Sequence, residues 1–301
     1  MIRELAPGFI AMRDHGDGFD SDLHNRWLDS MKDRSIVLRS EYLLDDTVKR
    51  NYPNIHFKFD HDHKIKLLSA LNNYNIHPVA KAKHFLCSFN GMDHVSRKLL
   101  TAALHKAHWF SEQTCSKNFT TTVDEIDGYL FDYVGSDSQF YRKFFLGTQS
   151  PYFLNTVFSF GHTRFDHGSN IYALEAQLTS CFVNIVSETM ATSYYPFVTE
   201  KFLYSVITRG LFVAYAQPGW HEHLETFFGF KKYKKIFDYQ FDTLANPIVR
   251  LVELITMLSK FSALEPDDWT DLIQMEFDTI EHNIDHYRSG RYLENLRNFD
   301  V

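Results

Sequence analysis

Short apolar runs and helical periodicity alternate along the second half of the chain. Cys181–Ser187 and Leu211–Ala216 are continuous apolar runs of the length expected for buried strands. Thr199–Arg209 lies between them and has the pattern of a helix, with Thr199 as N-cap and Gly210 in the position of a helix-ending glycine. A strand, a helix and a second strand in this order predict a βαβ unit with parallel strands.

The rest of the chain carries signals of both kinds, which together predict layers of helices and strands. Apolar runs before residue 150 predict strands over Ile36–Arg39, Ile55–Phe59, His84–Phe89 and Tyr129–Tyr133. Periodicity predicts helices over Lys64–Tyr74, Ser96–Phe110, Trp220–Phe228, Ile248–Lys260 and Asp267–Tyr287. Loop-like sequence at Gly147–Tyr152 indicates a boundary near residue 150, so we expect domains over 1–150 and 151–285 and a tail over 286–301.

Composition narrows the class of protein. Of the 301 residues, 44% are apolar and 23% are charged, which is typical of a globular chain and excludes disorder as the main state. No uncharged apolar run reaches the ~18 residues of a membrane-spanning helix. The three cysteines form no CxxC motif, which fits a reducing cytoplasm and argues against a cysteine-based zinc site. The net charge of −7 predicts no global attraction to nucleic acid.

Ligand-type side chains gather at one edge of the predicted βαβ unit. Glu188 directly follows the first strand, and Thr199-Glu200-Lys201 begins the helix. Open α/β sheets bind ligands at the carboxyl ends of their strands, where helix N-termini offer N–H groups to anions. Lys201 can bind a phosphate, and the carboxylate of Glu188 or Glu200 can accept hydrogen bonds from two adjacent sugar hydroxyls. These residue types suit a nucleotide-diphosphate sugar.

A series of short motifs extends over this region, and a further motif lies near the end of the chain. They are Ser187-Glu188-Thr189, Thr199-Glu200-Lys201, Gly210, Leu211–Ala216, Gly229-Phe230, Phe237 and Glu281-His282-Asn283. In its strand and helix context the run Phe182–Arg250 resembles the C-terminal domain of GT-B glycosyltransferases related to fucosyltransferases and exostosins, a group that includes small phage and viral enzymes. The resemblance implies an α/β fold of GT-B type, in which two Rossmann-like domains face a central cleft.

The resemblance also implies a binding site for the sugar donor between these domains. The ribose, sugar and phosphates of the donor are expected to contact Glu188, Thr199, Glu200 and Lys201. Arg97 is similar in position to a cation that faces the pyrophosphate in these enzymes, although Gly91-Met92-Asp93 is less basic than the corresponding segment of the relatives. The co-substrate implied is a UDP- or GDP-type sugar, with no tightly bound cofactor. A metal-independent mechanism is implied as well, since no Asp-x-Asp is clearly placed after a strand.

A catalytic base has to come from elsewhere in the chain. An inverting transferase needs a carboxylate or histidine that removes the proton of the acceptor hydroxyl. The segment HGDGFD offers His15, Asp17 and Asp20, and its two glycines let a loop approach a ligand closely. Asp93 is a further candidate.

The densest basic cluster is a candidate acceptor site. Lys231, Lys232 and Lys234 could contact a polyanion and Tyr233 could stack on a base, or the segment is a solvated loop. The expected acceptor is a growing glycan or lipopolysaccharide, or a hydroxymethylated pyrimidine in phage DNA. Two other functions stay open: a non-catalytic nucleotide- or carbohydrate-binding protein with the same fold, and a metal-dependent hydrolase that uses the histidines.

Overall fold

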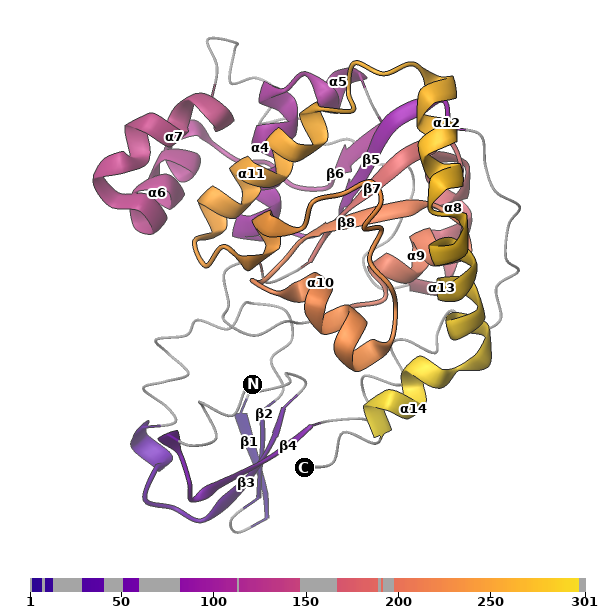
Figure 1. Ribbon diagram of the computed structural model, residues 1–301. Coiled ribbons are helices and arrows are strands. Elements are labelled where there is room, and N and C mark those ends of the chain that lie inside the picture. Colours follow the sequence, from indigo (N-terminus) through magenta and orange to yellow (C-terminus); the bar gives the residue numbers. More distant parts are fainter. Residues whose placement is uncertain are drawn as a thin grey trace.

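The strands of the computed structural model form two separate four-stranded sheets (Figure 1). The structure describes residues 2–6, 9–12, 29–40, 51–59, 82–112, 114–146, 167–188, 191 and 198–297. The predicted helix Lys64–Tyr74 lies outside these ranges.

The smaller sheet is built near the N-terminus. Its strands, in sheet order, are β1 (Ile2–Ala6), β2 (Phe9–Met12), β3 (Ile36–Ser40) and β4 (Ile55–Phe59). The first two pair antiparallel, and the β2–β3 and β3–β4 pairs are parallel. The predicted strands over 36–39 and 55–59 are confirmed, whereas the two strands before them, β1 and β2, were not predicted.

The larger sheet is parallel throughout and carries the central core. Its strands are β5 (His84–Asn90), β6 (Thr114–Lys117), β7 (Cys181–Ser187) and β8 (Leu211–Tyr215), in the order β6-β5-β7-β8. This confirms an α/β fold with a parallel sheet. Because β5 and β6 precede residue 150 and β7 and β8 follow it, the sheet crosses the expected domain boundary.

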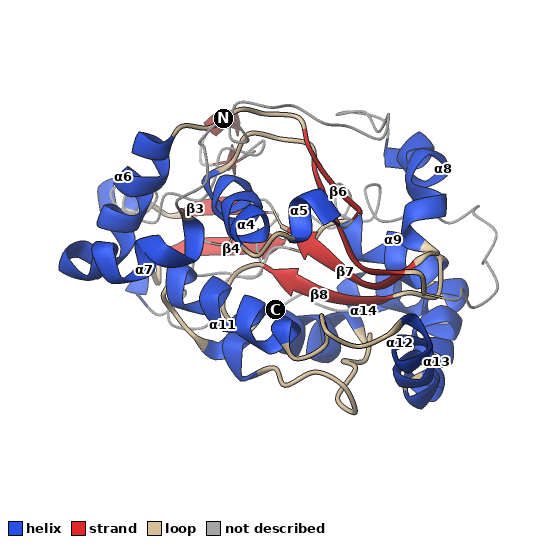
Figure 2. Ribbon diagram, turned by 90° about the horizontal axis from the view of Figure 1, so that it is seen from above, coloured by secondary structure: helices blue, strands red, loops and turns tan. Residues whose placement is uncertain are grey.

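Helices surround the strands of this sheet, and Figure 2 shows β7 and β8 side by side among them. Two residues of β8 an odd number of positions apart lie on opposite faces of the sheet, and both faces are covered: Phe212 packs on Phe202, whereas the Tyr215 hydroxyl donates to the carbonyl of Pro247. The helical segments are α4 (Val95–Lys106), α5 (Trp109–Glu112), α6 (Val123–Val134), η1 (Gly135–Asp137), α7 (Ser138–Phe145), α8 (His167–Leu178), α9 (Lys201–Ile207), α10 (Trp220–His223), the π-helical turn η3 (Leu224–Phe228), η4 (Gln240–Thr243), α11 (Pro247–Ser259), α12 (Pro266–Met275), α13 (Phe277–Ser289) and α14 (Arg291–Arg297).

The core of the larger unit is aromatic. Phe85 of β5, Phe182 of β7 and Trp269 of α12 are buried and their ring centroids lie 5.8–6.3 Å apart. Such ring pairs contribute about 0.5–1.5 kcal/mol beyond the burial of their area. Their packing fastens α12 to two strands whose carboxyl ends carry the candidate site.

One predicted strand is wrong. Tyr129–Tyr133 belongs to α6, whose start is a capping box. Thr122 Oγ1 accepts a hydrogen bond from the Glu125 N–H at 3.1 Å, and Glu125 Oε2 accepts one from the Thr122 N–H at 2.7 Å. The Thr-x-x-Glu spacing was a readable helix-start signal that outweighs the short aromatic run.

Four expectations about where helices end are corrected. The segment predicted over 96–110 is interrupted where His108 takes a φ of +64°, so that α5 follows separately. The expected long helix over 267–287 breaks at Glu276, a buried residue whose carboxylate accepts from the Lys235 N–H at 2.5 Å and from Thr279 Oγ1 at 2.7 Å. At the end of α9 it is Arg209, with a φ of +55°, that has the left-handed conformation, and not Gly210. Where a tail was expected from residue 286, α13 continues and α14 follows.

Candidate functional site at the strand-order reversal

The order of the strands places a reversal between β5 and β7. From β5 the chain proceeds to β6 on one side, whereas β7 leads to β8 on the other side. In open α/β sheets such a reversal creates a crevice at the carboxyl ends of the two strands, and ligands bind there. Asn90 ends β5 and Ser187 ends β7 at this edge.

Direct contacts join the two segments that leave these strands. Arg97, in the first turn of α4, donates from a terminal guanidinium nitrogen to the carbonyl of Ser187 at 3.4 Å. Ser96 Oγ donates to the carbonyl of Glu188 at 3.4 Å. The predicted donor residues Arg97 and Glu188 therefore meet at the reversal, although 91 positions of the chain separate them.

Glu188 uses both carboxylate oxygens within the protein. Oε1 accepts from the Thr199 N–H at 2.9 Å and Oε2 accepts from Thr199 Oγ1 at 2.7 Å. The start of α9 is therefore met by a buried carboxylate of the protein itself, where the sequence predicted a phosphate. Glu200, not Thr199, occupies the N-cap position of this seven-residue helix. Glu188 thus positions the loop that leads into α9.

Lys201 differs from its neighbours in exposure. Its side chain is 25% exposed, whereas Arg97, Glu188 and Glu200 are at most 2% exposed. Lys201 Nζ donates to Thr199 Oγ1 at 3.0 Å and lies 3.7 Å from Glu200 Oε1. Because an ammonium group has three donors, Lys201 keeps the capacity to bind an anion from solvent.

Burial governs the electrostatics of Arg97. It lowers the pKa of the guanidinium to about 10, while the negative charges of Glu188 and Glu200 act in the opposite direction. At neutral pH the guanidinium therefore stays charged and lies beside two carboxylates. These buried charges depend on one another, because removal of one would leave the others without compensation. The three residues therefore stabilise this edge of the sheet.

The N-terminus of α4 opens at the same edge. This twelve-residue helix has His94 as N-cap without a side-chain cap, and no acidic residue in its first turn. Its first N–H groups and the positive end of its dipole therefore suit an anion. Within the described part of the chain, the buried atoms Asn90 Oδ1 and Ser187 Oγ have no hydrogen-bond partner. Since buried polar atoms are normally paired, these two strand ends are candidate ligand contacts.

The predicted catalytic residues His15, Asp17 and Asp20 lie outside the described residues. A buried pair that was not predicted, His221 and Asp242, resembles an acid–base couple, with His221 Nδ1 2.9 Å from Asp242 Oδ1. The Nε2 atom of His221, however, accepts the N–H of Ala214 in the edge strand β8 at 2.9 Å. This acceptor position is occupied, so His221 covers a strand edge and is not a base.

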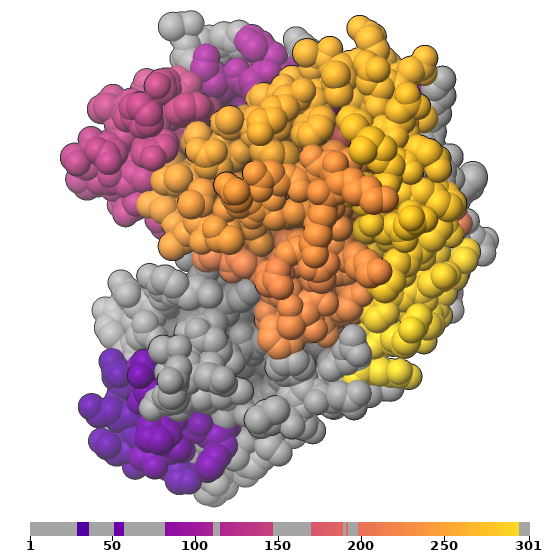
Figure 3. All heavy atoms as spheres, viewed as in Figure 1, coloured from indigo at the N-terminus to yellow at the C-terminus, as the bar shows by residue number. Residues whose placement is uncertain are grey.

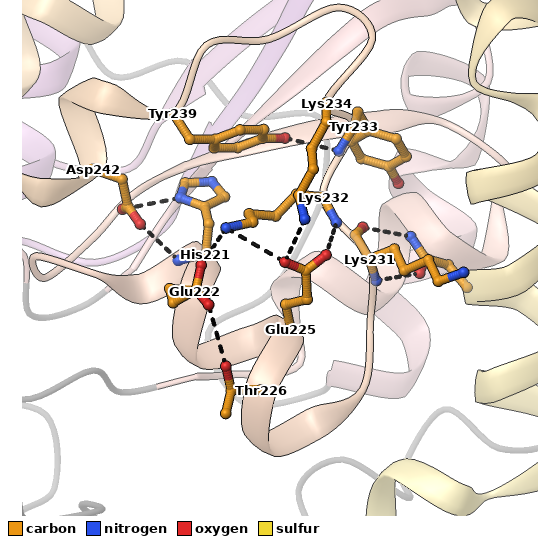
Figure 4. Close-up of polar contacts among 11 residues, drawn as sticks. His221, Glu222, Glu225, Thr226, Lys231, Lys232, Tyr233, Lys234, Tyr239 and Asp242 are labelled. Atoms are coloured by element: carbon orange, nitrogen blue, oxygen red, sulfur yellow. Dashed lines mark hydrogen bonds and ion pairs between the residues drawn. The ribbon is translucent and has the colours of Figure 1, made fainter.

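The predicted acceptor lysines are bound by carboxylates of the chain itself (Figure 4). Lys232 Nζ contacts Glu222 Oε2 at 2.5 Å and Glu225 Oε2 at 3.4 Å, and Lys234 Nζ contacts Glu225 Oε2 at 2.8 Å. The local positive charge that a polyanion would need is therefore largely compensated.

Burial holds Tyr233 in place, and main-chain hydrogen bonds hold Lys231 in place. Tyr233 is 1% exposed and its hydroxyl donates to the Gly210 carbonyl at 3.4 Å, so the ring does not present a face on which a base could stack. The main chain of Lys231 exchanges two hydrogen bonds with the side-chain amide of Asn283, at 2.7 and 3.1 Å. With the 3.1 Å contact of His282 Nε2 to the Gly229 carbonyl, the Glu281-His282-Asn283 motif fastens α13 to the end of η3.

The described residues form neither a metal site nor a membrane-spanning helix. Among the described residues, no group of three or more His, Cys, Asp or Glu side chains is placed to hold a metal ion. In the same ranges, no helix is long and apolar enough to cross a membrane. Comparison with protein-family models, with curated proteins and with solved structures finds no match to this chain.

Proposed function

We propose that this chain binds a nucleotide-diphosphate sugar at the reversal between β5 and β7 and transfers the sugar to a hydroxyl acceptor. One observation carries the proposal. The fold brings Arg97, from a distant part of the sequence, together with Glu188 and Thr199-Glu200-Lys201 at the edge of a parallel sheet where such folds bind ligands.

Each part of the edge has a distinct role in this proposal. The diphosphate lies between the N-terminus of α4 and Lys201, and Asn90 Oδ1 accepts a hydrogen bond from a sugar or ribose hydroxyl. Glu188 and Arg97 are positioning residues, since they are buried and bonded within the protein. Preorganised positive groups stabilise the charge that develops on the leaving diphosphate.

The proposed architecture is of GT-B type, with the larger α/β unit as the donor side. The segment that contains His15, Asp17 and Asp20 belongs to the acceptor side and supplies the base of an inverting reaction. No tightly bound cofactor is required in this proposal. The compensated charges of Lys232 and Lys234 favour a glycan acceptor over a DNA base.

The first test of the proposal is the binding of nucleoside diphosphates, measured as a rise in the melting temperature. We expect UDP or GDP at a hundredfold excess over its dissociation constant to add about 2.7 kcal/mol of stability, which raises the melting temperature by a few degrees. Lys201→Ala should weaken this binding about tenfold or more, since a charge-assisted hydrogen bond is lost. Lys260→Ala, an exposed lysine that follows α11, is the matched control. Absence of binding to every nucleoside diphosphate contradicts the proposal.

Turnover separates the transferase from a non-catalytic binding protein. The full chain is incubated with UDP- and GDP-sugars, with and without oligosaccharide acceptors, and the released nucleoside diphosphate is measured in the presence of a chelator. Release that depends on acceptor supports transfer. Binding without release under all conditions supports the non-catalytic alternative, and loss of activity with the chelator contradicts metal independence.

A further inference from the structure

The loop between η3 and η4, together with η4, lines an open surface hollow of about 590 Å³. Figure 3 shows the orange surface of residues 220–245, which includes this loop, on the face of the molecule toward the viewer. A volume of this size is within the range of about 300–1,000 Å³ that small-molecule sites have. Its lining includes Lys232, Lys234, Asp238, Tyr239, Gln240 and Thr243.

The aromatic wall of the hollow is held rigidly. The Tyr239 hydroxyl accepts from the Tyr233 N–H at 3.1 Å, and its ring centroid lies 4.7 Å from that of His221. His221 in turn is held by Asp242, which accepts its backbone N–H at 2.9 Å, and by the edge strand (Figure 4). Tyr239 therefore presents a preorganised ring, which reduces the entropy that binding would cost.

The rim of the hollow offers both donors and acceptors. Asp238 and Gln240 are exposed, and the Gln240 N–H donates to Asp238 Oδ1 at 3.0 Å, which fixes the turn between them. The carboxylate of Asp238 accepts, the amide of Gln240 does both, and the ammonium groups of Lys232 and Lys234 donate. Adjacent hydroxyls of a sugar need this mixture of partners.

The charge balance favours a neutral occupant. Two ammonium groups, of Lys232 and Lys234, stand near three carboxylates, those of Glu222, Glu225 and Asp238. A phosphate would meet a net negative site, whereas a neutral polyol would meet oriented charged partners without electrostatic repulsion.

We propose that this hollow binds the ring of a neutral hexose, with its apolar C–H face against Tyr239 and its hydroxyls on Asp238, Gln240 and the paired lysines. The site is separate from the edge of the sheet and needs no nucleotide, so it goes beyond the proposed function.

Saturation-transfer difference NMR tests the site on the full chain without nucleotide. The probes are the methyl glycosides of glucose, galactose and mannose, and N-acetylglucosamine. We expect ring-proton signals from at least one of them. The double variant Asp238→Ala/Gln240→Ala should weaken its binding about tenfold, since two hydrogen bonds are lost. Gln274→Ala, which removes an exposed amide on α12, should leave the affinity unchanged.

The possible outcomes are distinct. No signal from any of the four sugars overturns the proposal, as does binding that is equal in the double variant and in the full-length parent. Inorganic diphosphate or duplex DNA that displaces the sugar, with displacement lost in Lys234→Gln, shows an anion site and overturns it too. Tyr239→Phe keeps the aromatic ring and removes the hydroxyl, so the sugar signals should be retained. This variant distinguishes the contribution of the ring contact from that of the hydroxyl. Since the assay contains no nucleotide, failure here leaves the Lys201 test of nucleotide binding unaffected.

Discussion

Two clusters of charged residues, one at the edge of the parallel sheet and one on the loop after η3, look alike in the sequence but differ in the structure. In the first, Arg97, Glu188 and Glu200 are buried, and Arg97 and Glu188 form hydrogen bonds with residues of other segments. In the second, Lys232 and Lys234 pair with glutamates near the surface. Burial therefore decides whether a charged residue stabilises the fold or faces solvent.

The difference in burial and pairing changes what each cluster can bind. At the sheet edge the protein itself supplies the hydrogen-bond donors to Glu188, so in the proposed function Lys201 and the start of α4 are the groups that contact the ligand. On the loop the carboxylates compensate the lysines, so the site suits a neutral molecule better than a polyanion. Substitutions in the two clusters should therefore differ greatly in their effect on stability.

The largest effect is expected for Arg97→Met. The variant leaves two buried carboxylates without their cation, so the free energy of unfolding should fall by about 3–5 kcal/mol in urea unfolding. Arg142→Met is the matched control, because Arg142 pairs with Asp127 at 2.7 Å in a half-exposed position and should cost less than about 1 kcal/mol. Equal losses in the two variants would show that burial does not distinguish the two pairs.

A smaller effect, which depends on pH, is expected at Lys117. Burial lowers its pKa to about 8, whereas in the unfolded chain the pKa returns to about 10.4. Between these two values the unfolded state binds more protons, so this lysine makes the folded state more stable as pH rises from about 8 to 10. Below pH 8 both states are charged and the cost of burying the charge is present in full.

Lys117→Met should therefore stabilise the chain at pH 7 by about 1–3 kcal/mol, and this advantage should shrink as the pH approaches 10. Urea unfolding of both proteins at several pH values measures the difference, in which the other titrating groups cancel. Lys260→Met, at an exposed position, should show neither effect. An advantage of Lys117→Met that is constant with pH contradicts the lowered pKa.

The smallest effect is expected for Lys234→Gln. The Lys234 side chain is 62% exposed and pairs with Glu225, so the loss should be below about 1 kcal/mol and should vanish at about 1 M salt, where surface pairs are screened. Unfolding at low and at high salt measures it. A loss that is large and independent of salt would place this lysine with the buried cluster.

Much of the larger sheet was predictable because its strands are short continuous apolar runs. The range Cys181–Ser187 is confirmed residue for residue, and the predicted strands at 84–89 and 211–216 are confirmed to within one residue. β6 was missed because Thr114–Lys117 is short and polar, and its place in the sheet depends on pairing with β5. The short aromatic run Tyr129–Tyr133 favours a strand by itself, but the capping box before it starts a helix that includes this run.

The sequence by itself determined the alternation of strands and helices, the parallel βαβ unit and the convergence of Glu188 with Thr199 at its edge, because these depend on local periodicity and on neighbours along the chain. Only the tertiary structure decided which charges are buried, which lysines are compensated and which helix N-terminus stays open. Those properties depend on contacts between distant residues, such as Arg97 with Ser187 and Lys231 with Asn283, and no local pattern contains them.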